Sequence, residues 1–212
     1  MAAARIPGFR RQLAGIDMMA PRRPAKYDDL LAVPGTMIGE ILFDRVVTHP
    51  RPGLRHCAVN AALLGVLGSF FLQKSGRDSW IFICKPELHL GPHVVIPSLA
   101  AWRRQRLRLS PEAAWIDIAP DWICEVLSPE TSACVRAEKG RIYASAGVTH
   151  VWHIDPVLRM LEVFELSEGK WLLLEVFRDD VEVKAAPFAD PSFRLNLLWP
   201  LDVAPPVQDE TK

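Results

Sequence analysis

The sequence has no excess of charge of either sign and no long apolar run. Its 212 residues hold 25 Lys plus Arg and 25 Asp plus Glu, so no overall positive field steers it toward nucleic acid. The longest apolar stretch, around Ala58–Leu72, contains Asn60 and is too short to cross a membrane. Residues 1–26 have scattered arginines but no continuous apolar segment, which argues against a secretory signal. We therefore expect a cytoplasmic protein without membrane association, in which any site for a polyanion is local.

Cysteine is scarce, and several common catalytic motifs are missing. The four cysteines, Cys57, Cys84, Cys124 and Cys134, form no Cys-x-x-Cys pair and have no regular spacing. This pattern favours small buried hydrophobic residues in a reducing compartment over a zinc site. No Gly-x-Ser-x-Gly motif surrounds Ser128, and no Walker or Gly-x-Gly-x-x-Gly phosphate loop occurs. The sequence therefore gives no support to a serine hydrolase or a nucleotide-binding protein.

Half of the residues are apolar and seven are tryptophan, which is enough for one folded domain. We expect residues 1–26 to be a disordered extension, 27–201 to be the domain and 202–212 to be a loose tail. The patterns predict, in order, a short helix from Tyr27, strands Met37–Leu42 and Val46–His49, a helix from His56 to about Lys74, strands Trp80–Cys84 and His93–Ile96, a strand within 121–128, a helix Val135–Gly147, and strands Thr149–Asp155, Met160–Leu166 and Trp171–Phe177. This order predicts an α/β fold: a mixed β-sheet flanked by helices, with peripheral hairpins.

A carboxylate lies in the middle of a strand that should be buried. The run Asp121-Trp-Ile-Cys-Glu-Val-Leu-Ser128 is rich in β-branched and aromatic residues and is closed by a proline. Alternation places Glu125 on one face with Ile123 and Leu127, opposite Trp122, Cys124 and Val126. Burying a charge is costly unless the charge is paired. Lys139, on the helix that follows, is the candidate partner, so Glu125 is either a salt-bridged structural group or part of a site.

Glu40 is a second carboxylate within a predicted strand, and Ser98 follows the strand that ends at Ile96. A hydrolase that cuts phosphodiesters needs oxygen ligands for Mg²⁺ and a cation near the attacking water. Glu125, the backbone carbonyl of Val126 and Lys139 would supply part of such a site. On spacing alone, Glu40 fits an exposed hairpin residue equally well, and Lys139 fits a solvated helix residue.

The basic stretch Trp102-Arg-Arg-Gln-Arg-Leu-Arg108 is the candidate for contact with nucleic acid. Arg103, Arg104 and Arg106 can form bidentate hydrogen bonds with phosphate, and Trp102 can stack on a base. The alternative is a solvated loop or helix face, which the zero net charge favours.

Several segments resemble, in order, the Uma-two family of bacterial restriction endonucleases. They are Glu40, a helix led by His56, Pro97-x-Leu99 followed by Trp102-Arg-Arg, Pro120-Asp-Trp-Ile-Cys-Glu-Val-Leu-Ser-Pro-x-Thr131, Lys139, Tyr143, Gly147-Val and Val151-Trp-x-x-Asp-Pro156. The resemblance runs from about Tyr27 to Leu201. It implies the PD-(D/E)XK nuclease fold and DNA cleavage dependent on Mg²⁺ (or Mn²⁺). It also implies catalytic roles for Glu40, Glu125 and Lys139, with the metal at Glu125 and the Val126 carbonyl.

The sequence departs from this family pattern at two positions. The metal-binding Asp of the family falls on Ser98, and a second Asp falls on Val135. Because a neutral serine is a poor ligand for Mg²⁺, we expect an endonuclease with an impaired metal site. The alternative is a catalytically inactive nuclease-fold protein that binds nucleic acid or a protein partner. A homodimer is expected only by analogy with other restriction nucleases.

Overall fold

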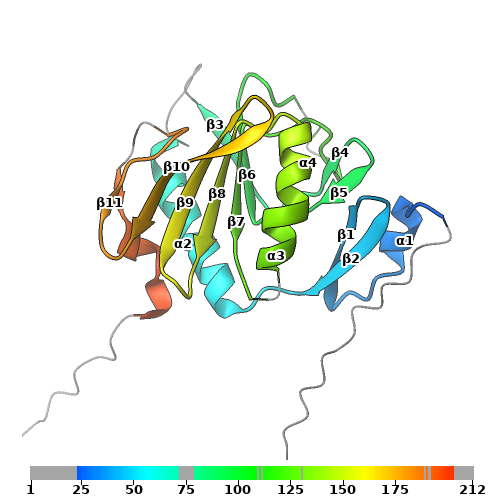
Figure 1. Ribbon diagram of the computed structural model, residues 1–212, viewed down its shortest axis with the longest axis horizontal. Helices are drawn as coiled ribbons and strands as arrows, with labels where there is room; N and C mark the ends of the chain where they lie inside the picture. Colours follow the sequence, from blue (N-terminus) through cyan, green and yellow to red (C-terminus); the bar gives the residue numbers. More distant parts are fainter. Residues whose placement is uncertain are drawn as a thin grey trace, which may run out of the picture.

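A six-stranded mixed sheet forms the centre of the protein (Figure 1). The computed structural model describes residues 23–71, 79–108, 110, 112–129, 131–188, 190 and 192–202. The strands of the central sheet, in spatial order, are β10 (Lys170–Arg178), β9 (Met160–Ser167), β8 (His150–Asp155), β7 (Trp122–Val126), β6 (Leu99–Arg103) and β3 (Trp80–Cys84). Strands β7 and β8 are parallel, whereas the other neighbouring pairs are antiparallel. This arrangement confirms the predicted α/β class with a mixed sheet.

A second, four-stranded sheet lies beside the central one, at the right in Figure 1. Its strands, in spatial order, are β2 (Arg45–Pro50), β1 (Met37–Leu42), β5 (His93–Val95) and β4 (Leu88–Leu90), with α1 (Tyr27–Leu31) next to β1. The predicted hairpin of β1 and β2 is confirmed. Its two turn residues, Phe43 and Asp44, have φ values of 48° and 62°, as a tight two-residue hairpin turn requires. This hairpin carries Glu40.

Helices cover both faces of the central sheet. Helix α2 (Leu54–Phe71) packs on one face, and a composite helix lies across the other, in front of the sheet in Figure 1. The composite helix consists of α3 (Ser132–Cys134), the π-helical turn η2 (Val135–Lys139) and α4 (Gly140–Ser145). It ends near Gly147, whose φ of +78° suits the predicted glycine stop. The remaining elements are β11 (Glu182–Val183), β12 (Phe193–Arg194), η3 (Leu195–Leu198) and η4 (Pro200–Asp202).

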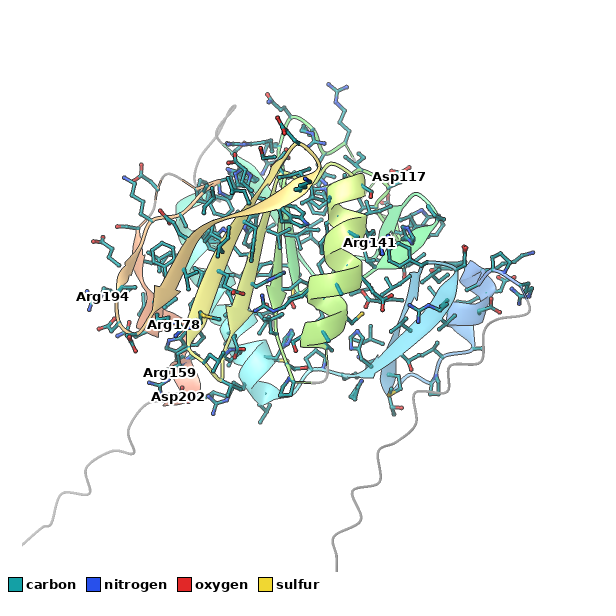
Figure 2. The ribbon with its side chains drawn as sticks, in the orientation of Figure 1. Asp117, Arg141, Arg159, Arg178, Arg194 and Asp202 are labelled. Carbon is teal, nitrogen blue, oxygen red and sulfur yellow. The ribbon has the colours of Figure 1, made fainter. Side chains whose placement is uncertain are left out.

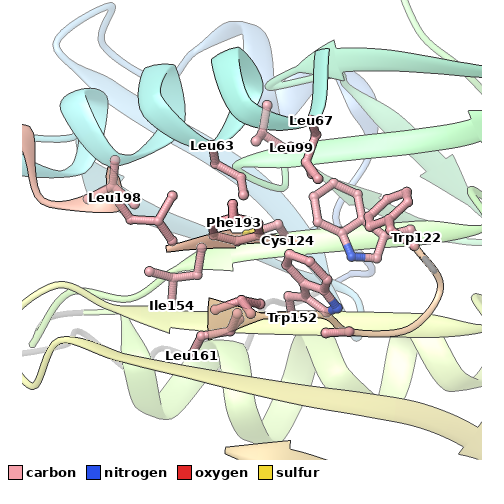
Figure 3. Packing of buried hydrophobic residues seen from close by; sticks show 14 of the residues in the cluster. Leu63, Leu67, Leu99, Trp122, Cys124, Trp152, Ile154, Leu161, Phe193 and Leu198 are labelled. Atoms are coloured by element: carbon pink, nitrogen blue, oxygen red, sulfur yellow. The ribbon is translucent and has the colours of Figure 1, made fainter. Parts of the chain in front are cut away.

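The two faces of β7 contribute to two separate cores. Towards α2, the apolar residues Trp122, Cys124 and Val126 pack with Leu63 and Leu67 of the helix (Figure 3). Towards the composite helix, Ile123 packs with Ile142 and Tyr143. The predicted alternation along β7 is therefore confirmed. Burial of each large apolar side chain contributes about 1.5–3 kcal/mol, so both helices are held mainly by these contacts.

Three expectations about local structure need correction. Residues 101–103 are neither loop nor helix, because they belong to β6, a central strand that begins with the apolar run Leu99-Ala-Ala-Trp102. Strands β11 and β12 were not predicted. Cys57 and Cys84 are exposed rather than buried, because they lie on the outer side of α2 and at the end of the edge strand β3.

Several predicted segments lie wholly or partly outside the described residues. These are the N-terminal extension up to residue 22, the end of the helix that was expected to reach Lys74, and the tail from residue 203. Residues 23–26 are described, and the Ala25 amide donates to the Asp44 carbonyl at 3.0 Å. In the part of the chain that the structure describes, no helix combines the length and the apolar character needed to cross a membrane.

Candidate active site

Four residues that the sequence singled out meet where the two sheets adjoin. Glu40 comes from β1, Glu125 from β7 and Lys139 from η2, and Ser98 lies immediately before β6. Each of the four is at most 5% exposed. The structure therefore brings together residues that are up to 99 positions apart in the sequence.

Lys139 is at the centre of this cluster. Its Nζ lies 2.7 Å from Glu125 Oε1 and 2.9 Å from Glu40 Oε1, and it also donates to the Ile96 carbonyl at 3.3 Å. An ammonium group has three protons, so these three oxygens can accept all of them. Burial lowers the pKa of Lys139, but the two carboxylates outweigh it and the pKa is raised overall. The side chain is therefore a permanent cation at physiological pH.

The π-helical turn η2 presents Lys139 to the carboxylates. Gly140, the residue after the turn, donates its amide hydrogen to the Val135 carbonyl, five residues back. Turns of this kind insert one extra residue into a helix and occur often at functional sites. Trp171 on β10 donates to the Gly140 carbonyl at 2.8 Å, which fixes the helix against the central sheet. The lysine is thus held by backbone geometry as well as by its ion pairs.

Two contacts tie the hairpin that carries Glu40 to the helix that carries Lys139. Arg45 on β2 forms an ion pair of 2.5 Å with Glu138, the neighbour of the lysine. On α4, the guanidinium carbon of Arg141, labelled in Figure 2, lies 4.9 Å from the centroid of the Phe43 ring. These contacts fasten the second sheet, through its hairpin, to the helix that carries Lys139.

Glu40 remains ionised because three donors surround it. Its Oε1 accepts a hydrogen bond of 2.6 Å from the Ile96 amide, and its Oε2 lies 3.4 Å from His49 Nε2. Burial alone would raise the pKa of Glu40, but Lys139, His49 and the amide together lower it to about 2. In return, the hydrogen bond to Glu40 is the main cause of the raised pKa of His49. His49 was not predicted as a site residue.

Glu125 is held by three groups besides the lysine. The Tyr143 hydroxyl donates to Oε1 at 2.6 Å, and Oε2 accepts from the Ser98 amide at 3.3 Å and from the Ser98 hydroxyl at 3.5 Å. Burial is the main reason that the pKa of Tyr143 is well above its usual value, so the phenol is a neutral donor. The Tyr143 ring is buried in the core, and its hydroxyl belongs to this cluster.

Ser98, at the position of the missing aspartate, is tied into the protein by its hydroxyl. The Val126 amide donates to Ser98 Oγ at 3.1 Å, and His56 Nε2 lies 3.2 Å from the same oxygen. Burial lowers the pKa of His56 to about 4, so this imidazole is neutral at pH 7. His56, at the start of α2, is half-buried and contacts the cluster through Ser98. The backbone carbonyl of Val126 remains a predicted ligand only.

The carboxylates, as they are placed here, do not fit a divalent metal ion. Glu40 Oε1 and Glu125 Oε1 each contact Lys139, and the two Oε2 atoms contact His49 and Ser98 respectively. All four oxygens are therefore in contact with donors from the protein. Among the described residues, no group of three or more His, Cys, Asp or Glu side chains could hold a metal ion. Mg²⁺ needs several oxygen ligands in near-octahedral geometry, and this arrangement does not provide them.

The basic stretch lies away from this cluster. Ser98 precedes β6 and Arg103 ends it, so the arginines are about 16 Å away along the strand. Arg106 is ion-paired with Asp121, the Arg103 guanidinium carbon lies 4.2 Å from the centroid of the Trp80 ring, and Arg104 is exposed. The prediction that Trp102 stacks on a base is wrong, because its side chain is fully buried and its indole donates to the Ile118 carbonyl at 2.9 Å.

The chain resembles known proteins both in its fold and in its sequence family. No curated protein sequence matches the chain. A solved structure, the "Crystal structure of a putative nuclease belonging to DUF820 from Anabaena variabilis ATCC 29413", superposes with a TM-score of 0.68. The match covers 83% of this chain and 98% of that one at 23% identity, so it supports a shared fold. The family model Uma2, described as "Putative restriction endonuclease", matches residues 26–198. Because that match covers most of the sequence, the chain belongs to the Uma2 family.

Proposed function

We propose that this protein is a DNA endonuclease of the Uma2 type whose hydrolytic site is impaired. The observation that carries the proposal is the convergence of Glu40, Glu125 and Lys139 in one buried cluster, with Ser98 beside Glu125. Two carboxylates and a lysine are the groups that phosphodiester hydrolysis uses, and a serine stands where the third carboxylate is expected. Family membership supports a nuclease. DNA as the substrate is part of the proposal, and so is Mg²⁺ (or Mn²⁺) as the metal of the site that an aspartate at position 98 would complete.

In this proposal the residues present supply only part of what phosphodiester hydrolysis requires. Lys139 supplies a positive charge beside Glu125 and Glu40, but its Nζ is buried and contacts three oxygens of the protein. Ser98 contributes a hydroxyl, which is a weak ligand and carries no charge. Because the carboxylate oxygens contact protein donors, the natural chain does not present them to a metal ion.

The second candidate is a catalytically inactive nuclease-fold protein that binds nucleic acid or a protein partner. It is supported by the same cluster, since the ion pairs of Lys139 and the hydroxyl of Ser98 leave a site closed by its own residues. Val135, at the position of the second aspartate, is buried and apolar, which adds to this support.

The test compares DNA cleavage by the natural chain, Ser98→Asp and Ser98→Asp/Glu125→Ala, with Mg²⁺ and with Mn²⁺. We expect little or no cleavage by the natural chain, cleavage by Ser98→Asp and none by the double variant. If the natural chain cuts as fast as Ser98→Asp in a metal-dependent way, the site is not impaired. If no variant cuts any plasmid or oligonucleotide, the endonuclease proposal fails.

A binding assay then separates the two functions. An inactive DNA-binding protein should bind a duplex in the presence of a chelator, and its affinity should fall steeply as salt rises from 50 to about 200 mM, by roughly 10³-fold or more if six phosphates are contacted. A protein that acts through a protein partner would show no such binding.

A further inference from the structure

We propose that the ammonium group of Lys139 takes the place of a metal ion in this cluster, so that the native protein is complete without a divalent cation. The proposal concerns how the buried carboxylates are neutralised and does not rest on DNA cleavage. The Uma-two family is expected to use a metal ion, but in this protein both carboxylates are already bound by donors of the protein.

Nζ of Lys139 is surrounded by oxygens in the way that a bound metal ion would be. It lies 2.7, 2.9 and 3.3 Å from oxygens of Glu125, Glu40 and Ile96. These oxygens are two carboxylates and a backbone carbonyl, which are the ligands that hard cations prefer in proteins. They come from β7, from β1 and from the segment that follows β5, so distant parts of the chain converge on one positive charge.

The charges of the cluster can balance without a metal ion. Glu40 and Glu125 are 1% and 3% exposed, and leaving two buried carboxylates without a counter-charge is very costly. Lys139 supplies one positive charge, and His49, beside Glu40 Oε2, can supply another. A divalent ion added to this set would bring excess positive charge into a buried volume. It would also have to occupy the space between the same two Oε1 atoms that Nζ already contacts.

A consequence is that removal of the ammonium should create a cation site. Lys139→Met keeps a flexible unbranched side chain and removes the charge. Glu40, Glu125 and the Ile96 carbonyl would then surround an empty position. The distances from Nζ to these oxygens exceed the 2.0–2.1 Å of Mg²⁺ and are nearer the 2.3–2.6 Å of Ca²⁺, whose coordination is also more adaptable. We therefore expect the variant to bind Ca²⁺ more tightly than Mg²⁺.

The experiment measures thermal unfolding and calorimetric binding for the natural chain and Lys139→Met, in EDTA and in millimolar Ca²⁺ or Mg²⁺. The natural chain should unfold at the same temperature in all three solutions and bind neither ion. Lys139→Met should be strongly destabilised in EDTA and should regain about 5–10 °C in Ca²⁺ at a hundred times its dissociation constant.

Two control variants make this test specific. Lys139→Met/Glu125→Gln lacks one ligand and one buried charge, so it should be more stable in EDTA than Lys139→Met and should not respond to Ca²⁺. Lys170→Met removes an exposed lysine from β10 and should behave like the natural chain.

The proposal is overturned by any of three results. The first is a Ca²⁺ or Mg²⁺ response in the natural chain as large as that of Lys139→Met. The second is a Lys139→Met protein that is unfolded, or equally stable, with and without Ca²⁺, because then no other cation can replace the ammonium. The third is an undiminished Ca²⁺ response in the Glu125→Gln double variant, which would place the ion elsewhere. None of these readouts requires cleavage, so failure of the proposed endonuclease function would be detected separately.

Discussion

The two faces of β7 are packed differently: one lies against apolar side chains, and the other contains a buried ion pair. On the α2 face, Trp122 packs edge-to-face with Trp152, with 5.3 Å between ring centroids, in a core of apolar side chains. On the other face, Glu125 is just as deeply buried, but it is surrounded by Lys139, Tyr143 and Ser98. A strand can therefore carry a charge into the interior when a helix delivers the compensating groups to that face alone.

The faces should also differ in how they tolerate substitution. Truncation in an apolar core costs the transfer free energy of the removed atoms plus a term for the cavity, because the neighbours relax only partially. A buried charge cluster loses more when one member is removed, because the remaining charges stay buried and unpaired.

Removal of the carboxylate on the charged face should have the largest effect. Glu125→Ala leaves Lys139 with one carboxylate and the Tyr143 hydroxyl without its acceptor, so we expect a loss of about 4 kcal/mol in the free energy of unfolding. Urea unfolding measures it. Glu175→Ala, on the exposed strand β10, is the control and should change stability by less than about 0.5 kcal/mol. Equal effects of the two changes would mean that the cluster does not stabilise the fold.

Truncation on the apolar face should cost somewhat less. Leu63 is fully buried between α2 and the sheet (Figure 3), so Leu63→Ala should lower stability by about 3 kcal/mol, measured in the same way. Leu54, on the same helix, is 83% exposed, and Leu54→Ala should have almost no effect. A loss at Leu63 well above that at Glu125 would reverse the comparison between the faces.

Acid should weaken the charged face selectively. The pKa of Glu40 is lowered from 4.5 to about 2 in the folded protein, so its contribution is present above pH 4.5 and is lost as the pH falls toward 2. The shift corresponds to a contribution on the order of 3 kcal/mol. Stability measured from pH 7 to pH 2 should therefore fall less steeply below pH 4.5 in Glu40→Gln than in the natural chain.

Histidines also titrate in the pH range over which the two proteins are compared. The pKa of His56 is lowered to about 4 by burial, so its protonation destabilises both proteins as the pH falls from 6.5 toward 4. The pKa of His49 is raised, so its contribution is lost only as the pH rises above 6.5. Burial also lowers the pKa of His153, to about 3, but His56 and His153 titrate in both proteins alike. The difference between the two curves below pH 4.5 therefore reports on Glu40, and parallel curves there would contradict its assigned ion pairs.

The sequence anticipated the charged face better than its surroundings. Alternation along β7 separated Glu125 from the tryptophans, and the resemblance to the Uma-two family drew attention to Glu40 and Lys139. Tyr143 lies four residues after Lys139, a helical spacing that places both side chains on one face and could have identified it as a partner. His49 lies opposite Ile38 in the hairpin and so on the same face as Glu40.

Other features depend on contacts between distant segments and have no local signal. The π-helical turn that ends at Lys139 brings the lysine to two carboxylates on other strands, whereas the sequence Val135-Arg-Ala-Glu-Lys139 is typical of an ordinary helix. Strand β6 was not predicted, because its apolar run Leu99-Ala-Ala-Trp102 is short and is followed directly by arginines. Trp102 is buried by residues packed on its face of the sheet, among them Leu107 and Ile116.

The smallest effect should come from the two tyrosines, which form a matched pair in this chain. Tyr143 donates to buried Glu125, and Tyr27 donates to Glu87 on the surface. A hydrogen bond to a charged group in the interior contributes about 1.5–3 kcal/mol, whereas an exposed one competes with water. Tyr143→Phe should therefore lower the free energy of unfolding by about 2 kcal/mol, and Tyr27→Phe by less than about 0.5 kcal/mol. If urea unfolding shows equal losses, burial does not strengthen the bond to Glu125, and the charged face of β7 is held by Lys139 and Ser98 without a contribution from Tyr143.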